Sequence, residues 1–422
     1  MPSRLFVVAA AVLLELGTAA CTARPAVHAP DPAGPAGPAE KSRVVAYFTD
    51  WSVYNRNYQV KDVQTSGAAG RLTDLVFAFG TVTGGRCAPG DAWADYQRPT
   101  PAAQSVDGVA DSAGAVLRGA IGQLRKLERL HPRLKVLWSF GGWTGSAGFT
   151  AAARDPAAFA ASCKAVLDDR RWAGVFDGID IDWEYPNACG LGCDHSGPGG
   201  LPRLIAALRA ALGPRALISV AATADAGKLA AGGFPAAARD ADWLNAMTYD
   251  YFGTAADGPA ADDDPAAGDG AGGPTEPHSP LVAFPGIPRA SSAESTVNAM
   301  LRLGIPARKI LLGIGFYGRG WTGVTDPAPG GRATGPAAGR YEKGIEDYAI
   351  LAVRCPPTGT IGGTAYAHCG RQWWSYDTPA SIKTKMAYAA STALGGAFAW
   401  ELSGDTAHAD LLTAMADGLN RS

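Results

Sequence analysis

The chain has 422 residues, of which 37 are Lys or Arg and 39 are Asp or Glu, so its formal net charge at pH 7 is −2. Because basic and acidic residues are evenly mixed along the chain, nothing in the composition points to nucleic-acid binding. The length allows a large hydrophobic core and is long for one domain, although barrels often exceed the usual domain length.

Residues 1–20 are typical of an export signal peptide. Arg4 supplies a positive charge, residues 5–16 form an apolar run that Glu15 interrupts, and Thr18-Ala19-Ala20 is a small-residue cleavage site. The apolar run is too short to span a bilayer as a helix. Cys21 follows directly and resembles the lipidated cysteine of bacterial lipoproteins, although Thr18 replaces the usual Leu. We therefore expect an extracellular protein, either secreted or lipid-anchored through Cys21 to the outer face of a bacterial membrane.

A linker rich in Pro, Ala and Gly follows at residues 21–42, and such a composition is typical of a flexible tether. Beyond it, in residues 43–422, short runs rich in β-branched and aromatic residues alternate with Ala- and Leu-rich helical patterns. Strands are predicted at residues 44–51, 74–80, 135–142, 176–185, 217–223, 243–251, 309–317 and 395–402. Helices are predicted at residues 115–130, 156–168, 200–212, 292–303 and 381–394.

Eight strands separated by helices favour a (β/α)₈ barrel. The alternative, an open doubly wound sheet, usually has fewer strands. In a barrel of this kind the functional residues lie at the C-terminal ends of the strands. The ends of the predicted strands are therefore where a functional site is expected.

Two connections are too long for a simple helix. Residues 254–280 are rich in Asp, Gly, Pro and Ala, which predicts a mobile surface loop. The acidic run at residues 262–264 lacks the spacing of an EF-hand, so a solvated loop is favoured over a calcium site. Residues 322–375 contain two cysteines and several aromatics, including Trp373 and Trp374. We expect them to form a small α+β subdomain, inserted between the last two barrel strands, that flanks the functional face.

Setting Cys21 aside leaves six of the seven cysteines. An even set in an exported chain favours disulfides. Local bridges are favoured where two cysteines lie close in sequence, and two cysteines then remain for a third bridge. Six cysteines allow many other connectivities, which stay open. The favoured pairs are Cys189 with Cys193, Cys355 with Cys369 and Cys87 with Cys163.

The predicted strand at residues 176–185 carries Asp177, Asp180, Asp182 and Glu184 in an otherwise apolar run. Because side chains alternate along a strand, the last three share one face and the apolar residues share the other. Buried unpaired carboxylates are costly, and the segment has no Lys or Arg to pair with them. A catalytic wall is therefore favoured over a cluster held by salt bridges. Like charges at this spacing predict that Glu184 binds a proton more readily than a free Glu.

Two other kinds of site are disfavoured. Carboxylate clusters can bind Mg²⁺ or Ca²⁺, but we find no matching His-x-His or His-Glu-x-x-His pattern, so no metal is predicted. Residues 313–318 spell Gly-x-Gly-x-x-Gly after a strand, yet the glycine-rich residues that follow do not open a helix, as a dinucleotide site requires. No cofactor is expected.

The chain resembles the glycoside hydrolase family 18 chitinases, in particular the bacterial type with an insertion before the last barrel strand. Residues 177–184 match the family's Asp-x-x-Asp-x-Asp-x-Glu signature at every defined position. Residues 139–142 match its Ser-x-Gly-Gly element, and residues 247–250 match its Met-x-Tyr-Asp element. The ends of the last two predicted strands also match. The resemblance runs from about residue 44 to the C-terminus.

The resemblance implies a chitinase that hydrolyses the β-1,4 linkages of chitin and chitooligosaccharides by a retaining, substrate-assisted mechanism. It assigns proton transfer to Glu184 and orientation of the substrate acetamido group to Asp182. Asp180 would share a proton with Asp182, and Tyr249 would donate to the acetamido oxygen. The expected sugar-binding residues are Tyr47, Trp51, Phe79, Gly141, Trp143, Met247, Asp250, Tyr317, Arg319 and Trp400.

Some of these residues also make sense alone. Gly141 lacks a side chain where a ligand would approach the backbone, although a tight turn explains it nearly as well. Tyr249 could direct its hydroxyl into the barrel mouth, and a core Tyr is the alternative. Trp400, at the end of the last strand, could stack on the apolar face of a sugar ring instead of filling the core.

Two other functions fit part of the pattern. An endo-β-N-acetylglucosaminidase that acts on N-linked glycans shares the carboxylate signature, and a non-catalytic chitin-binding lectin shares the fold. The insertion and the many aromatics favour long chitin chains, and Glu184 favours an enzyme over a lectin. We expect chitin and N-acetylglucosamine oligosaccharides as the binding partners, no nucleic-acid or protein partner, and a monomer.

Overall fold

The computed structural model describes residues 42–253, 273–285 and 291–420. The expected signal peptide, most of the linker, Cys21 and the acidic run at residues 262–264 lie outside the described residues. Within them, no helix is both long enough and apolar enough to cross a membrane.

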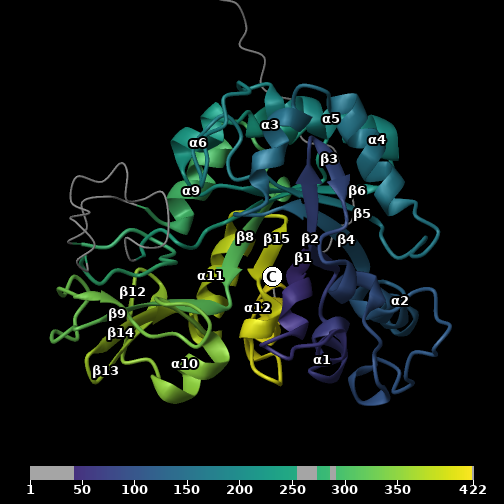
Figure 1. Cartoon of the computed structure of the whole chain (residues 1–422). Coiled ribbons are helices and arrows are strands. Elements are labelled where there is room, and N and C mark those ends of the chain that lie inside the picture. The colour runs from purple at the N-terminus through teal and green to yellow at the C-terminus, as the bar shows by residue number, and fades with distance from the viewer. Residues whose placement is uncertain (1–41, 254–272, 286–290, 421–422) are drawn as a thin grey trace, which may run out of the picture. The chain divides into compact units, whose positions relative to one another are not determined.

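Within the described residues, eight parallel strands close into a barrel (Figure 1). The spatial order is β1-β15-β8-β7-β6-β5-β4-β2, and β1 also pairs with β2, which closes the ring. The predicted (β/α)₈ barrel is therefore confirmed. The strands are β1 (Arg43–Thr49), β2 (Asp74–Thr83), β4 (Lys135–Gly141), β5 (Gly178–Asp182), β6 (Leu217–Ala222), β7 (Trp243–Ala246), β8 (Ile310–Gly315) and β15 (Gly396–Trp400).

Helices connect these strands, and several begin with a side-chain cap. Asp155 accepts a hydrogen bond from the Ala158 N–H at the start of α4, and Thr378 and Ser381 cap α11 reciprocally. The helices are α1 (Val60–Thr65), α2 (Gly119–Leu130), α3 (Phe149–Ala152), α4 (Pro156–Leu167), α5 (Gly200–Leu212), α6 (Ala226–Ala231), α7 (Phe234–Ala237), α9 (Ala293–Arg302), α10 (Tyr348–Arg354), α11 (Pro379–Ser391) and α12 (Asp410–Asn420).

Two apolar layers hold the barrel together. The outer layer lies between strands and helices and includes Ile179, Ile181 and Trp183. The inner cluster fills the barrel, with Tyr249 and Trp400 packed against it. The side chains of β5 therefore alternate as predicted, with apolar residues toward the helices and carboxylates toward the barrel interior. The inner cluster consists of Val45, Tyr47, Val76, Ala78, Leu137, Trp243, Leu311 and Phe398.

A second, antiparallel sheet lies in the chain between β8 and β15, beside α10. It begins at Tyr317, not at residue 322, because the chain forms a new strand directly after β8. Trp321, Trp373 and Trp374 are buried in it, so these aromatics contribute to its hydrophobic packing. Its strands are β9 (Tyr317–Thr322), β10 (Gly335–Pro336), β11 (Ile345–Asp347), β12 (Gly359–Ile361), β13 (Thr364–Cys369) and β14 (Gln372–Tyr376).

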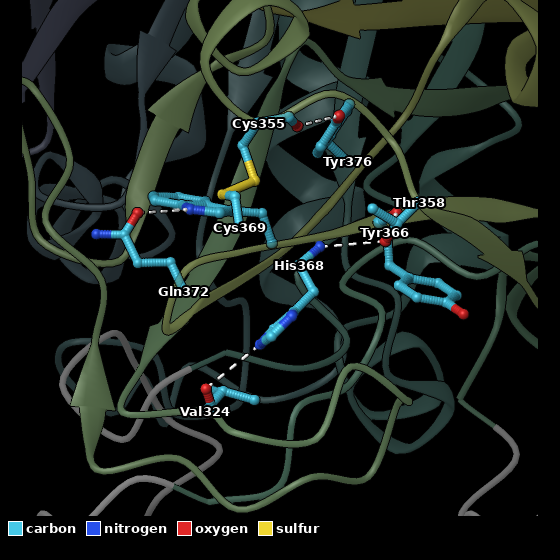
Figure 2. The surroundings of a disulfide bond; sticks show 9 residues. Val324, Cys355, Thr358, Tyr366, His368, Cys369, Gln372 and Tyr376 are labelled. Atoms are coloured by element: carbon cyan, nitrogen blue, oxygen red, sulfur yellow. Dashed lines mark hydrogen bonds between the residues drawn. A yellow bond between two sulfur atoms is a disulfide. The ribbon is translucent and has the colours of Figure 1, made fainter.

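Three disulfides join the two pairs that the cysteine spacing favoured and the pair that then remained. One links the short strand β3 (Arg86–Ala88) to α4, and a second closes the loop after β5. The third joins the residue after α10 to the end of β13, where Tyr376 Oη donates to the carbonyl of the first cysteine at 2.7 Å (Figure 2). The pairs are Cys87–Cys163, Cys189–Cys193 and Cys355–Cys369.

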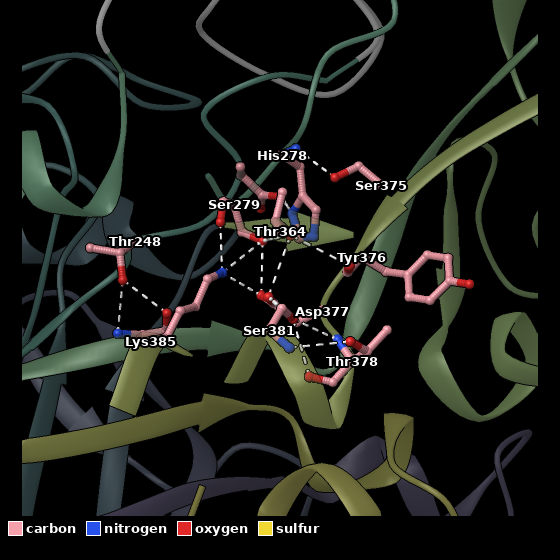
Figure 3. Close-up of polar contacts among 12 residues, drawn as sticks. Thr248, His278, Ser279, Thr364, Ser375, Tyr376, Asp377, Thr378, Ser381 and Lys385 are labelled. Atoms are coloured by element: carbon pink, nitrogen blue, oxygen red, sulfur yellow. Dashed lines mark hydrogen bonds and ion pairs between the residues drawn. The ribbon is translucent and has the colours of Figure 1, made fainter. Parts of the chain in front are cut away.

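The end of the long connection after β7 differs from the expected surface loop. Thr275, His278 and Ser279 are fully buried. They are covered because the segment runs between the second sheet and α11, where Lys385 and Asp377 form a buried ion pair (Figure 3). Composition alone could not indicate this, since the burial depends on residues about a hundred positions further along the chain.

A buried acidic pair includes the residue that follows β1. Asp50, directly after β1, is almost fully buried, and Asp95 is fully buried. Neither carboxylate oxygen of Asp95 has a hydrogen-bond donor among the described residues. Burial, together with the charges of Asp50 and Asp91, raises the pKa of Asp95 to about 9. Burial and the charge of Asp91 raise the pKa of Asp50 to about 7. Two ionised carboxylates can only accept, so the two can hydrogen-bond to each other only when one carries a proton.

This pair predicts that stability falls as pH rises. The folded state holds a proton that the unfolded chain releases near pH 4, so the free energy of unfolding should decrease between about pH 4 and pH 9. Asp95→Asn cannot ionise and its amide can donate to Asp50, so the variant should gain about 4 kcal/mol relative to wild type between pH 5 and pH 8. Urea unfolding at the two pH values measures this. Asp168→Asn, which alters an exposed ion pair with Lys164, is the control. If the free energy of unfolding of Asp95→Asn changed with pH as much as that of wild type, the assignment would be wrong.

Candidate active site

The site is built at the C-terminal end of the barrel, around β5. Asp180 and Asp182 lie on this strand, and Glu184 follows it directly. The chain after β7 places Tyr249 beside them. Burial raises the pKa of Tyr249 well above the usual value, and the charges of Asp182, Asp250 and Glu184 act in the same direction. The catalytic residues that the sequence suggested are therefore brought together.

Asp180 lies deepest and is fully buried. Its carboxylate accepts hydrogen bonds from Tyr47 Oη at 3.0 Å, Ser139 Oγ at 2.6 Å, Ser219 Oγ at 2.6 Å and Asn245 Nδ2 at 3.4 Å. Burial raises its pKa more than these donors lower it. The donors come from β1, β4, β6 and β7, so the orientation of this carboxylate is fixed by four other strands of the barrel.

Asp182 is buried two residues after Asp180 on β5, on the same face of the strand. One of its carboxylate oxygens, Oδ1, has no hydrogen-bond partner among the described residues. Burial first, then the charges of Glu184 and Asp180, raise its pKa well above the usual value. A buried carboxyl group with an unused oxygen costs free energy, and a ligand N–H would relieve that cost.

Glu184 is half-buried, and its backbone N–H donates to Ser146 Oγ at 2.8 Å. Burial raises the pKa of its carboxyl group to about 7, and the charge of Asp250 acts in the same direction. A hydrogen bond from Tyr185 and the charge of Lys228 oppose this rise. The sequence predicted the direction of the shift but attributed it to like charges, whereas burial is the larger cause. Glu184 can therefore exist as an acid near neutral pH.

Asp250 has a φ of 57°, in the left-handed region that non-glycine residues rarely adopt. Its Oδ2 accepts from Tyr317 Oη at 2.7 Å and its Oδ1 from Arg319 Nε at 2.8 Å. Burial would raise its pKa, but Arg319 and His278 hold the pKa well below the usual range. Asp250 is therefore an ionised carboxylate held at the edge of the site by side chains from other segments.

Aromatic side chains form one partly exposed wall. Phe79 and Trp400 stack with ring centroids 5.7 Å apart, and Trp51, which is 41% exposed, packs 5.9 Å from Phe79 and 6.3 Å from Trp400. Next to Trp51 a hollow of about 290 Å³ extends to the second sheet, where the Arg56 guanidinium lies 4.3 Å from the centre of the Tyr341 ring. The hollow is lined by Trp51, Tyr54, Asn55, Arg56, Tyr341, Glu342, Ile345 and Asp347.

Three of the expected sugar-binding residues also make contacts within the barrel. Tyr47 is buried inside the barrel, where its hydroxyl donates a hydrogen bond to Asp180. A Cβ on Gly141 would lie 2.1 Å from the carbonyl oxygen of Asp182, so this glycine makes room for the protein's own backbone. Met247 packs against the inner barrel cluster. Trp143, in contrast, lies beside the site with its ring 6.3 Å from that of Tyr185.

The sequence did not identify several residues of the site. Ser219 and Asn245 were isolated polar residues in apolar runs, which is a weak signal for an inward-facing position. Arg56 and Tyr341 lie far apart in sequence and had no motif. Among the described residues, no group of three or more His, Cys, Asp or Glu side chains is placed to hold a metal ion.

Comparison with known proteins agrees with this geometry. The family model for Glycosyl hydrolases family 18 matches residues 43–405. The chain belongs to this family. Chitinase C of Streptomyces lividans is 55% identical over 373 residues, which are 87% of this chain and 58% of the relative. Chitinase 63 of Streptomyces plicatus is 53% identical over 382 residues, 89% of this chain and 60% of the relative. This family 18 chain thus spans less than two thirds of the length of these two relatives.

The fold also matches solved structures. The catalytic domain of psychrophilic chitinase B from Arthrobacter TAD20 superposes with a TM-score of 0.82 at 32% sequence identity. The match covers 90% of this chain and 96% of that domain. The barrel of this family 18 chain is therefore shared with a relative over nearly its whole described length.

Proposed function

We propose that this family 18 chain is a chitinase, which hydrolyses the β-1,4 linkages between N-acetylglucosamine units of chitin and chitooligosaccharides. The observation that carries the proposal is the pair formed by Glu184, whose pKa is raised to about 7, and Asp182, whose Oδ1 has no partner among the described residues. The names of the Streptomyces relatives, both chitinases, support the same activity.

The reaction proceeds in two steps with net retention. Glu184 donates its proton to the glycosidic oxygen as the bond from that oxygen to the anomeric carbon breaks. The carbonyl oxygen of the substrate's own acetamido group forms a new bond to the anomeric carbon, which gives a cyclic oxazolinium ion. Water then loses a proton to Glu184 and attacks the anomeric carbon, which opens the ring. The substrate supplies the nucleophile, as in other substrate-assisted glycosidases.

Asp182 and Tyr249 orient the acetamido group. Asp182 accepts a hydrogen bond from the acetamido N–H, and its charge stabilises the positive intermediate. At rest Asp182 and Asp180 share a proton, because burial raises the pKa of both carboxyl groups. A cation beside Asp182 then favours its ionised form. Tyr249 keeps its proton because its pKa is raised, so it can donate to the acetamido oxygen.

The aromatic wall and the hollow beside Trp51 form a sugar groove that holds the rest of the polymer. Trp51, Phe79 and Trp400 offer apolar ring faces, and the C–H faces of pyranose rings pack well against aromatic rings. Asp250, fixed by Tyr317 and Arg319, offers a charged acceptor to sugar hydroxyls. We also propose that the protein is exported and monomeric, and three disulfides suit an oxidising compartment.

Product stereochemistry tests the mechanism. When N-acetylglucosamine oligomers of defined length are hydrolysed, NMR spectra recorded before mutarotation should show new reducing ends as the β-anomer. Two displacements at the anomeric carbon restore its configuration, which is the physical reason for this expectation. The same oligomers incubated without the enzyme provide the mutarotation control. Early accumulation of the α-anomer would contradict substrate assistance, because a single displacement by water inverts the centre.

A further inference from the structure

His278 is a fully buried histidine that the mechanism above does not use. It lies in the described segment 273–285, after the long connection that follows β7. Its backbone N–H donates to Ser375 Oγ at 3.0 Å (Figure 3). Its carbonyl accepts from the Tyr251 N–H at 2.9 Å. The backbone of His278 therefore links the second sheet to the chain directly after Asp250.

The next residue anchors this segment firmly. Ser279 Oγ donates to Asp377 Oδ2 at 2.9 Å, and Lys385 Nζ donates to the Ser279 carbonyl at 2.6 Å and to Asp377 Oδ2 at 2.5 Å (Figure 3). Lys385 and Asp377 are both fully buried. Removing one partner of a buried ion pair is strongly destabilising, so this network fixes the position of the segment.

The imidazole ring is directed at Asp250. Its Nδ1 lies 3.5 Å from Asp250 Oδ1, which is a charge contact and too long for a formed hydrogen bond. Neither ring nitrogen has another hydrogen-bond partner among the described residues. The ring centroid is 5.2 Å from that of Tyr317, and a Cβ on Gly315 would lie 3.2 Å from His278 Cε1, so the ring has little space to turn away. A buried imidazole without a partner is costly, and Asp250 is the acceptor beside it.

We propose that His278 is a positioning residue that acts through Asp250, holding its carboxylate toward the sugar groove by donating from Nδ1. Asp250 needs such support, because its left-handed backbone conformation is unfavourable for a residue with a Cβ. Tyr317 and Arg319 hold it from β9, and His278 holds it from a separate segment. Hydrogen bonds in a site without ligand are often long and shorten when the substrate binds. The inference rests on the proposed chitinase function, in which Asp250 contacts the sugar.

The test is a double-mutant cycle with tetramers of N-acetylglucosamine as substrate. His278→Leu removes the donor and keeps the site apolar, so kcat/KM should fall about tenfold or more, the usual effect of a lost hydrogen bond to a charged group. His278→Asn keeps an amide N–H near the position of Nδ1 and should stay within about threefold of wild type. In the Asp250→Asn background, His278→Leu should have almost no further effect, because residues that act as a unit are not additive.

His368→Leu is the matched control. This histidine lies in β13 with its Nε2 3.3 Å from the Val324 carbonyl oxygen (Figure 2), and the substitution should leave kcat/KM unchanged. Thermal unfolding of every variant checks that the barrel is intact. If His278→Leu has no effect, if His278→Asn loses as much activity as His278→Leu, or if the effects of His278→Leu and Asp250→Asn multiply, the inference is overturned while the proposed function stands. Absence of cleavage by the wild type would overturn both.

Discussion

Glu184→Gln should lower kcat on N-acetylglucosamine oligomers by about 10²–10⁴-fold, because the amide cannot donate a proton to the leaving oxygen. Gln has the same shape as Glu, and the hydrogen bond from the Glu184 backbone N–H to Ser146 does not involve the side chain. Folding and sugar binding should therefore remain close to wild type. Steady-state kinetics, calorimetric titration with an oligomer and thermal unfolding measure the three properties separately.

The matched control for this variant is Glu294→Gln, in the first turn of α9. It makes the same chemical change outside the site and should keep wild-type activity. If Glu184→Gln cleaved oligomers at nearly the wild-type rate, the assignment of the proton donor would be wrong. If it lost oligomer binding as well as turnover, Glu184 would have a ground-state role that the proposed mechanism does not include.

The second large effect concerns the substrate. Fully deacetylated oligomers should be cleaved at least about 10³-fold more slowly than acetylated oligomers of the same length, because a well-placed internal nucleophile contributes effective concentrations far above those of free groups. Glucosamine has no acetamido carbonyl, so no oxazolinium ion can form. Product formation followed by chromatography gives both rates.

Binding of the deacetylated oligomer must be measured in parallel, since a weaker complex alone could lower the rate. Rates compared at saturation remove that effect. Equal rates on both substrates would indicate that a carboxylate of the protein, with Asp182 the nearest to Glu184 on β5, acts as the nucleophile instead.

The sequence predicted the barrel well because each strand has a local signature. The alternation of β5 alone indicated that Asp180 and Asp182 face inward while Ile179 and Ile181 pack against helices, and the structure agrees. Local patterns of this kind do not depend on the rest of the chain. The same holds for the cysteine pairs that are close in sequence.

What could not be predicted depends on contacts between distant segments. Ser219 and Asn245 meet Asp180 only because their strands neighbour it in the closed barrel. The segment around His278 was expected at the surface because of its polar composition. Its burial depends on contacts such as that of Lys385 with Ser279, which the composition does not indicate. Trp321 and Trp373 are buried in the second sheet, and their places in the sequence did not indicate this burial. Burial, the main cause of the raised pKa of Glu184, is likewise a property of the folded chain.

Arg56 has a consequence for how a polymer is recognised. Its guanidinium forms a salt bridge with Asp347 in β11, lies 4.3 Å from the centre of the Tyr341 ring, and has Nε 3.9 Å from Glu401 at the end of β15. The Arg56 side chain thus connects the second sheet to the barrel in the absence of a sugar ligand. A chitin chain would bind to a surface that is already ordered, so the protein would lose little conformational entropy on association. Affinity for the hollow beside Trp51 should therefore depend mainly on shape complementarity.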